Sequence, residues 1–358
     1  MKRTKDKFRM NDHKLLWHLD RVQKWQNGEK ISPIYLEVGI TRFCNIACRF
    51  CEYGTHMRKD RQMIQTDVLI KFLREAASIG VKGVGFFGDG EPLIHPGLYE
   101  ATIEGKKAGL DMAVASNGLV LIKDEKLKNF LDSLVLVRFN LSAGRADSYA
   151  SVTGMSENHF KKVVENIRKC VRVKKENNLK LTIGILMVLI KENETDIEAF
   201  AVLGQELGAD YVQIKQCTYD SKDKPDYIVD DYRNLEESMQ KAEAYSTEDY
   251  NVIVKRKKMN YKQKRYDHCY GCNFIIQISG TGEVYPCSDF FGNEKYSLGN
   301  INKESFRDIV LGDRYKKVMD MLADDIDVHK ECILTCRQNE INGFLWDLKN
   351  PPEHINFI

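Results

Sequence analysis

The chain has 358 residues, of which 43% are hydrophobic and 30% charged, an ordinary composition for a globular protein with one large α/β domain and an extra module. Its 54 Lys and Arg nearly balance its 52 Asp and Glu, so the net charge of +2 indicates no class of partner. No apolar run is long enough to span a bilayer, and the basic N-terminal segment has no apolar core. These features argue against a membrane span and a secretion signal, and they predict a cytoplasmic protein.

Short apolar, β-branched runs alternate with amphipathic segments along the first 216 residues. This alternation is typical of βαβ units and a parallel sheet. Six units are too few for a closed eight-stranded barrel, so the pattern predicts α/β class and a partial, open (β/α)6 TIM-like barrel. The expected strands are Tyr35–Ile40, Val81–Gly88, Asp111–Asn117, Leu134–Ser142, Leu181–Ile190 and Tyr211–Lys215, and the expected helices are Thr66–Gly80, Gly97–Gly109, Lys123–Leu131, Asn158–Asn178 and Asp196–Gly208.

The pattern changes after residue 216. A helix is expected near Asp231–Tyr245, and two short strands flank Gly280-Thr281-Gly282, which is a good hairpin signal. A further helix is expected over Ser305–Leu322. The predicted organisation is an N-terminal helical segment (1–34), the barrel (35–216), a helical linker (217–265), a small α+β extension (266–340) and a C-terminal tail (341–358).

The linker ends in a basic run, Lys255–Arg265, in which seven of eleven residues are Lys or Arg. Such a run can attract phosphate, as in a nucleotide-linked sugar, nucleic acid or an acidic peptide. A solvated connector between two modules is the simpler interpretation, and we do not expect nucleic acid as a partner.

The ten cysteines are unevenly spread, and disulfides explain them poorly because cytosolic thiols stay reduced. Clusters of reduced thiols point to metal binding. Cys170 and Cys217 stand alone and are expected to be small buried hydrophobes. The first group comprises Cys44, Cys48 and Cys51, and the second comprises Cys269, Cys272, Cys287, Cys332 and Cys336.

The first group forms a CxxxCxxC loop directly after the first expected strand. Three thiolates can bind three corners of a [4Fe–4S] cubane and leave one iron without a protein ligand. An open metal position is typical of a reactive site, and barrel active sites lie at the C-terminal ends of the strands. Zinc held by the three cysteines with His56 or His95 is the alternative, although structural zinc usually takes paired CxxC knuckles.

The second group surrounds the expected hairpin and helix. Two separated cysteine pairs in this setting can hold zinc or a second iron–sulfur cluster. The chemistry of the residues alone does not choose between them.

The first cysteine loop, with Phe50 directly before its third cysteine, resembles the radical S-adenosylmethionine (SAM) superfamily. In that family the open iron chelates SAM, and an electron from the cluster cleaves SAM to a 5′-deoxyadenosyl radical that abstracts a substrate hydrogen atom. Gly88-Asp89-Gly90-Glu91-Pro92, after the second strand, resembles the GGEP motif that holds the SAM amino group, with Asp89 in place of a glycine. The resemblance implies further contacts with SAM from Ser116, Asn117, Asn140, Ser142, Val188 and Leu189. Gln213 and Lys215, on the sixth strand, are candidates to contact the substrate.

The second cysteine group resembles the twitch form of the SPASM extension to radical SAM enzymes, which binds one auxiliary [4Fe–4S] cluster. A full SPASM extension would need further cysteines after Cys336, and none follow. The implied ligands are Cys269, Cys287, Cys332 and Cys336, with Cys272 as a rival for the place of Cys269.

These resemblances imply a radical SAM oxidoreductase that dehydrogenates or epimerises a sugar, cyclitol or nucleoside-type metabolite. Related twitch enzymes oxidise secondary alcohols, with the auxiliary cluster available as electron acceptor. Such a reaction needs a base, for which Asp89, Asp220 and Asp289 are candidates by position, and an electron donor such as flavodoxin or ferredoxin.

Two other functions remain open. One is a maturase that epimerises or cross-links a ribosomal peptide, although only 34 residues precede the first expected strand, which is short for a leader-binding domain. The other is a non-enzymatic, zinc-stabilised binding module that uses the basic run.

Overall fold

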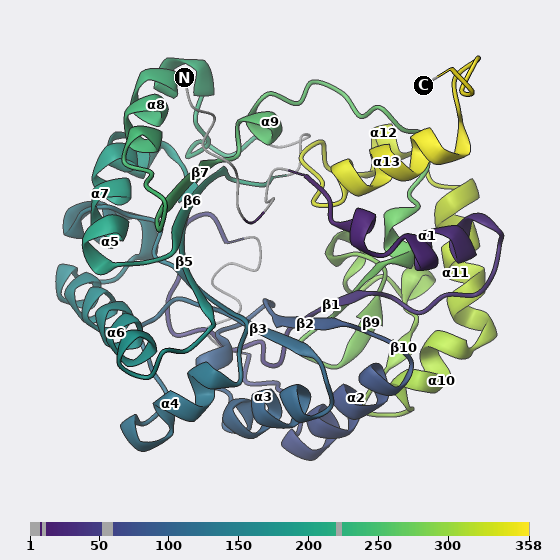
Figure 1. Cartoon of the computed structure of the whole chain (residues 1–358), viewed down its shortest axis with the longest axis horizontal. Helices are drawn as coiled ribbons and strands as arrows, with labels where there is room; N and C mark the ends of the chain where they lie inside the picture. The colour runs from purple at the N-terminus through teal and green to yellow at the C-terminus, as the bar shows by residue number, and fades with distance from the viewer. Residues whose placement is uncertain (1–7, 9–11, 52–59, 220–223, 358) are drawn as a thin grey trace.

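The computed structural model describes residues 8, 12–51, 60–219 and 224–357. One sheet of ten strands curves around a central lumen, in the order β10-β9-β8-β1-β2-β3-β4-β5-β6-β7 (Figure 1). Strands β8 and β1 to β7 pair in parallel, and β9 and β10 continue the sheet in antiparallel fashion. The strands are β1 Tyr35–Val38, β2 Gly83–Phe86, β3 Asp111–Ser116, β4 Leu136–Asn140, β5 Thr182–Leu189, β6 Tyr211–Gln216, β7 Asn251–Val254, β8 Ile275–Ile278, β9 Glu283–Tyr285 and β10 Gly299–Asn300.

Helices cover the outside of this sheet (Figure 1). No helix of the described residues is both long and apolar enough to cross a membrane. The helices are α1 Leu19–Gln26, α2 Thr66–Ser78, α3 Leu98–Lys107, α4 Asp124–Asp132, α5 Ala146–Thr153, α6 Glu157–Glu176, α7 Ile197–Leu207, α8 Glu236–Ala244, α9 Arg256–Met259, α10 Phe306–Leu311, α11 Asp313–Asp324, α12 Val328–Glu331 and α13 Asn339–Lys349.

The prediction of a partial TIM-like barrel is confirmed, and the structure extends it. All six expected strands form, each within a few residues of the predicted bounds. Strand β7, inside the segment expected to be a linker, pairs with β6, and β8 pairs in parallel with β1. Strand β7 did not stand out in the sequence because its four residues lie between a polar stretch and the basic run. The helix expected over Ser305–Leu322 is two helices, α10 and α11, which meet at Gly312.

Side chains alternate along the barrel strands between the lumen and the helices, as the pleat of a strand requires. On β1, Leu36 and Val38 are fully buried in the core under the helices, whereas Tyr35 and Glu37 line a cavity in the lumen. The alternation therefore gives an apolar outer core and a lumen that accepts polar side chains.

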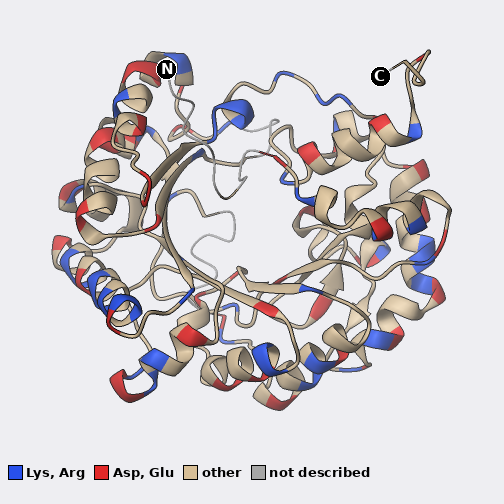
Figure 2. Ribbon diagram, in the orientation of Figure 1, with Lys and Arg blue, Asp and Glu red and all other residues tan. Residues whose placement is uncertain are grey.

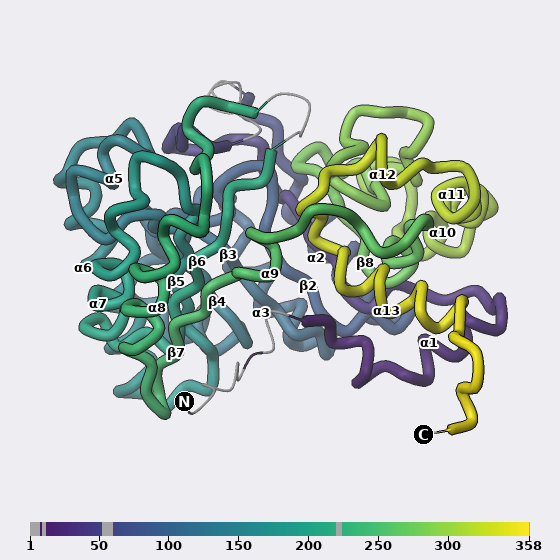
Figure 3. Tube along the Cα trace, turned by 90° about the horizontal axis from the view of Figure 1, so that it is seen from above, coloured from purple at the N-terminus to yellow at the C-terminus, as the bar shows by residue number. Residues whose placement is uncertain are grey.

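The two ends of the described chain pack together at the start of β8. Helices α1 and α13 lie side by side there (Figure 3), and their side chains form one apolar cluster that includes Val22, Phe274 and Leu345. The Arg21 guanidinium also donates hydrogen bonds to the carbonyl oxygens of Ser32, Pro33 and Gly80. The C-terminal helix is therefore part of the fold and packs on the barrel.

We expect Leu345→Ala to lower the free energy of unfolding by about 2–5 kcal/mol, because it opens a cavity at a fully buried position. Leu311→Ala is the matched control, since Leu311 is 46% exposed and its truncation should change stability by less than about 0.5 kcal/mol. Urea unfolding of anaerobically purified protein measures both. Equal effects in the two variants would show that α13 does not contribute to the folded unit.

Candidate active site

The first cysteine loop begins where β1 ends. Thr41 forms a bridge to Met63, and the backbone N–H groups of Ala47 and Arg49 donate to the C-terminal turn of α5. The Arg49 guanidinium pairs with Glu192 at 2.7 Å and with Asp226 at 2.9 Å. The loop is therefore held from three sides before any ligand is bound.

The three thiols of this loop differ in exposure. Cys51 is exposed, whereas burial raises the pKa of Cys44 to about 11 and raises that of Cys48 further. The Asn117 side chain at the end of β3 donates to Cys44 Sγ at 3.9 Å and to Asn45 Oδ1 at 2.7 Å. Metal binding by such thiols requires the loss of their protons, which a cationic iron centre favours.

The Gly88–Pro92 segment lies against the cysteine loop. A Cβ on Gly90 would come within 2.2 Å of the Thr41 carbonyl oxygen, so only glycine allows this approach. The Glu91 carboxylate accepts hydrogen bonds from the backbone N–H groups of Leu93, at 3.0 Å, and Asn117, at 2.7 Å. Glu91 therefore ties the ends of β2 and β3 together beneath the cysteines.

The electrostatics of Glu91 fit the cofactor that the sequence predicts. The side chain is 3% exposed, and burial raises the pKa of its carboxyl. No lysine or arginine pairs with it among the described residues. Burial mainly raises the pKa values of Cys44 and Cys48, and the Glu91 charge adds a smaller contribution to both, so Glu91 lies within electrostatic reach of these two thiols. A buried carboxylate without a cation, within reach of two of the three thiols, matches a ligand that carries an ammonium group.

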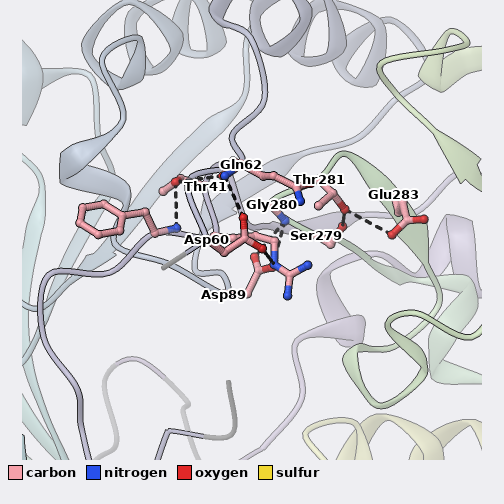
Figure 4. Close-up of polar contacts among 10 residues, drawn as sticks. Thr41, Asp60, Gln62, Asp89, Ser279, Gly280, Thr281 and Glu283 are labelled. Carbon is pink, nitrogen blue, oxygen red and sulfur yellow. Dashed lines mark hydrogen bonds and ion pairs between the residues drawn. The ribbon is translucent and has the colours of Figure 1, made fainter. Parts of the chain in front are cut away.

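Asp89, the departure from the GGEP pattern, joins the barrel to the β8–β9 hairpin (Figure 4). Its carboxylate accepts two hydrogen bonds from the Gly280 N–H, at 2.9 and 3.1 Å. A Cβ on Gly39 would lie 1.8 Å from Asp89 Oδ1, so a glycine is needed between them. Burial raises the pKa of Asp89 to about 6, while the bond from Gly280 lowers it. This candidate base thus has a structural partner in the hairpin.

The other residues expected to contact SAM fall into two sets. Ser116 and Ser142 are buried, and their hydroxyl oxygens accept hydrogen bonds from the backbone N–H groups of Gly118 and Val188. Ser142 adopts a positive φ of 56°, an uncommon conformation for a residue other than glycine, and such positions often lie at functional sites. The second set lines the cavity in the lumen and consists of Phe50, Gly88, Asn140 and Val188. Leu189 belongs to neither set, because it is fully buried and does not line the cavity.

The second cysteine group gathers under α13. Burial first, and then the charge of Cys269, raise the pKa values of Cys332 and Cys336 to about 12. Burial also raises the pKa of Cys287, with smaller effects from Asp289, Cys336 and Cys269. Cys269 and Cys287 also raise the pKa of Cys272, so each of the five cysteines is within electrostatic reach of others of the group.

Cys269 and Cys272 differ in their surroundings. The Cys272 thiol is fully buried and donates to the Cys269 carbonyl oxygen at 3.2 Å. Cys269 Sγ accepts a hydrogen bond from the Asn342 side chain at 3.6 Å, and Asn342 also accepts one from the Gly271 N–H. Sequence reasoning missed Asn342, because nothing in the pattern of α13 marks it. Its contacts favour Cys269 as the ligand.

The basic run is not a simple solvated connector. Lys264 is buried and donates to the Cys332 carbonyl oxygen at 2.9 Å. Burial lowers the pKa of Lys258, and the nearby Cys336 raises it. The Arg256 guanidinium pairs with Glu236 and Glu243. Part of the run therefore covers the second cysteine group and brings positive charge to it.

One cavity of about 960 Å³ occupies the lumen and reaches both cysteine groups. Its lining includes Phe50 and Cys51 from the first loop, and Cys287 and Cys336 from the second group. Gln213 and Lys215, expected at the substrate, also line it. The cavity therefore extends from one cysteine group to the other, as a substrate site between two clusters requires.

Several other candidates are placed as follows. Asp289 lines the cavity. Both ring nitrogens of His95 have backbone partners, Ile64 O at 2.7 Å and Gly97 N at 3.1 Å, so this imidazole is not available to zinc. Cys170 and Cys217 are buried among apolar side chains, as predicted. Asp220 and His56 lie outside the described residues.

No three His, Cys, Asp or Glu side chains within residues 12–51, 60–219 and 224–357 converge as they would on a single metal ion. The thiolates of a cubane each bind a different iron, so they lie further apart than the ligands of one ion.

A model of the radical SAM superfamily matches residues 38–203, and a model of the SPASM iron–sulfur cluster-binding domain matches residues 269–338. The chain therefore contains a radical SAM domain and a SPASM iron–sulfur domain. These matches confirm the expected cofactors, a [4Fe–4S] cluster with SAM and auxiliary iron–sulfur binding. The assignment of individual residues to them stays a prediction.

Known relatives of this radical SAM protein cover most of its length. It is 28% identical over 300 residues to the tungsten-containing aldehyde ferredoxin oxidoreductase cofactor-modifying protein of Pyrococcus furiosus. This alignment covers 78% of this chain and 82% of the relative. It is 23% identical over 273 residues to a GTP 3′,8-cyclase of Helicobacter pylori, spanning 71% and 79% of the two chains.

Among solved structures, SuiB of Streptococcus suis bound to SAM has a TM-score of 0.65 and 17% identity, and the alignment covers 86% of this chain and 72% of SuiB. SuiB has also been solved with its precursor peptide SuiA. At this identity the likeness shows the fold alone.

The Asp89–Gly280 contact predicts a pH dependence. Because the folded state holds the Asp89 proton up to about pH 6 and the unfolded state releases it near its ordinary value, the stabilisation from this carboxyl is full at low pH and is lost as the pH rises through 6. Asp89→Asn keeps an acceptor for the Gly280 N–H without a buried charge. We expect this variant to gain about 1 kcal/mol relative to wild type between pH 5 and pH 7.5.

Asp89→Ala is the control, because it leaves the Gly280 N–H without an acceptor and should therefore be less stable than Asp89→Asn by about 1–3 kcal/mol at every pH. Urea unfolding at a series of pH values measures all three proteins. A constant difference between Asp89→Asn and wild type would contradict the assignment of the shifted pKa to Asp89.

The ligand set of the second group can be tested in a chain that carries Cys44→Ala, Cys48→Ala and Cys51→Ala, so that only the auxiliary site binds iron. In that background we expect Cys272→Ala to keep about four irons per chain and Cys269→Ala to lose most of them. Iron and sulfide analysis with electron paramagnetic resonance measures both. The opposite result would make Cys272 the ligand.

Proposed function

We propose that this radical SAM protein is an oxidoreductase that dehydrogenates or epimerises a small polar metabolite, of the sugar, cyclitol or nucleoside type, in the barrel lumen. The observation that carries the proposal is the single cavity of about 960 Å³ that reaches Cys51 at one place and Cys287 and Cys336 at another. Its size is at the upper end of the range for small-molecule sites. A substrate there would lie within reach of both centres.

The polarity of the lumen supports a hydroxyl-rich ligand. Amide side chains line it from several elements, including Asn140 on β4, Gln213 on β6 and Gln277 on β8. The Oε1 atoms of Gln216, Gln277 and Gln338 have no hydrogen-bond partner among the described residues. Buried amides are normally satisfied, so small rotations of these side chains towards substrate hydroxyls would supply what the chain does not.

The chain supplies the residues that would hold the cofactors and the base that would accept the substrate proton. Cys44, Cys48 and Cys51 would hold the cluster, with Glu91 beside the ammonium group of SAM. SAM bound there supplies, on one-electron reduction, the radical that removes a hydrogen atom from the substrate. Oxidation of an alcohol then requires that the hydroxyl proton pass to a base and one further electron to an acceptor.

Asp289 is the candidate base whose side chain lines the cavity, and it lies close enough to the second cysteine group for its charge to raise the pKa of Cys287. The proton acceptor and the proposed electron acceptor, an auxiliary cluster on Cys269, Cys287, Cys332 and Cys336, are therefore on the same side of the lumen. A flavodoxin or ferredoxin would supply the electron that starts the reaction.

Two of the relatives support a small substrate without identifying it. One is named for the modification of a metal cofactor and another for the cyclisation of GTP. A peptide maturase is the second candidate, because the fold resembles SuiB, which has been solved with its precursor peptide.

We expect the triple variant Cys44→Ala, Cys48→Ala, Cys51→Ala to form no 5′-deoxyadenosine above background, because the thiolates that hold the reducing cluster are gone. The control is Cys170→Ala, which removes a buried thiol far from both groups and should keep about eight irons per chain and full SAM cleavage. Chromatography of reactions with dithionite measures the product. SAM cleavage that survives in the triple variant, or one zinc and no iron in wild type, would refute the proposal.

The substrate class can be tested with extracts of cells grown in deuterated water, separated into a small-molecule fraction and a peptide fraction. A hydrogen atom removed from substrate appears as deuterium in 5′-deoxyadenosine. Transfer from the small-molecule fraction supports the oxidoreductase. Transfer from the peptide fraction alone supports the maturase and contradicts a metabolite substrate.

A further inference from the structure

We infer that the lumen binds an oxyanion, a phosphate or carboxylate group of the substrate, on the guanidinium of Arg138. This inference rests on the proposed function only in taking the lumen as the place of the substrate. It adds that the substrate is an anion, with its charged group held in the lumen on β4, next to the amide of Asn140.

Arg138 is the central residue of β4 and points into the lumen. Val137 and Phe139, its neighbours along the strand, are almost fully buried under the helices, whereas Leu136, Arg138 and Asn140 line the cavity. In register Arg138 lies level with Gly184 of β5, which in turn pairs with Tyr211, the first residue of β6. On the other side Arg138 pairs with Ala115 of β3, and Phe87, the residue after β2, lies against its guanidinium.

The contacts of Arg138 leave its charge without a carboxylate. Its Nε donates to Asn140 Oδ1 at 3.3 Å, and its guanidinium lies 4.8 Å from the centre of the Phe87 ring. No Asp or Glu of the described residues pairs with it. By contrast, Arg337 and Lys257, which line the same cavity, pair with Glu37 and Glu340.

The Arg138 charge acts on a buried neighbour, Tyr211. Burial raises the pKa of Tyr211 to about 12, and the nearby Arg138 lowers it. A guanidinium partly removed from water gains most from an anion that it can bind through two parallel N–H groups, as phosphate and carboxylate allow. The Phe87 ring covers one face of the guanidinium and leaves the edge with the N–H groups for such a ligand.

The charge of the whole cavity also favours an anion. Eight Lys or Arg line it against five Asp or Glu. Lys215 on β6, Lys255 after β7 and Lys258 on α9 are among the basic residues. Figure 2 shows α9, which Figure 1 labels near β7, as a basic segment. Charges of one sign in a concave site raise the local concentration of the opposite ion.

The test is calorimetric titration of the SAM-loaded holoenzyme, under anaerobic conditions, with pyrophosphate and separately with malonate. We expect at least one of them to bind, and its affinity to fall about tenfold or more in Arg138→Gln. Arg138→Lys, which keeps the charge, should keep a large part of the affinity. The matched control is Arg172→Gln, an exposed arginine on α6 whose loss changes the net charge equally. If Arg138→Gln loses iron, Arg138→Met replaces it, because its side chain still covers the Phe87 ring.

A preference for pyrophosphate would identify the group as a phosphate, and a preference for malonate as a carboxylate. No binding by wild type, equal binding by Arg138→Gln, or an equal loss in Arg172→Gln would overturn the inference. So would the loss of uncoupled 5′-deoxyadenosine formation in Arg138→Gln, since the residue would then belong to the SAM site. Failure of the proposed function has a different signature, because wild type would then cleave no SAM whatever its affinity for oxyanions.

Discussion

The position of β1 between β2 and β8 is the constraint on which the rest of the site depends. Tyr35 pairs in register with Gly83 on one side and with Ile275 on the other. Because all three strands are parallel, the segments that follow them emerge at the same edge of the sheet. The cysteine loop after β1 therefore lies between the Gly88–Pro92 segment and the β8–β9 hairpin, although the hairpin is more than two hundred residues away in sequence.

Close packing converts this arrangement into a single unit. Gly39 allows the Asp89 carboxylate to pass the end of β1 and reach the Gly280 N–H, and Gly280 itself has no room for a side chain against Thr41 and Arg42. A residue that departs from the family motif thus connects the barrel to the SPASM domain. The geometry of the two cysteine groups is coupled through this contact, because a shift of the hairpin would strain the segment that also carries Glu91.

The lumen is both polar and rich in positive charge, and each property has a physical source. The alternation of strands sends Arg138, Asn140, Gln213 and Gln277 inward, so the interior is polar where a closed barrel would be filled by apolar side chains. The basic run adds positive charge from outside the sheet, with Lys258 and Lys264 close to the second cysteine group. Positive charge there would balance the charge that thiolates bring to an auxiliary cluster.

Local pattern in the sequence determined the thiol chemistry of the first loop and the six central strands, because thiol spacing, β-branched runs and glycine-rich turns act over a few residues. SAM and the auxiliary cluster came from the resemblance of these motifs to a known family. Only the tertiary structure decided that β7 and β8 extend the barrel, that Asp89 binds the hairpin, that the basic run covers Cys332 and Cys336, and that Asn342 contacts Cys269. Each of these is a pairing between residues distant in sequence, and such pairings depend on register and burial, which no local pattern records.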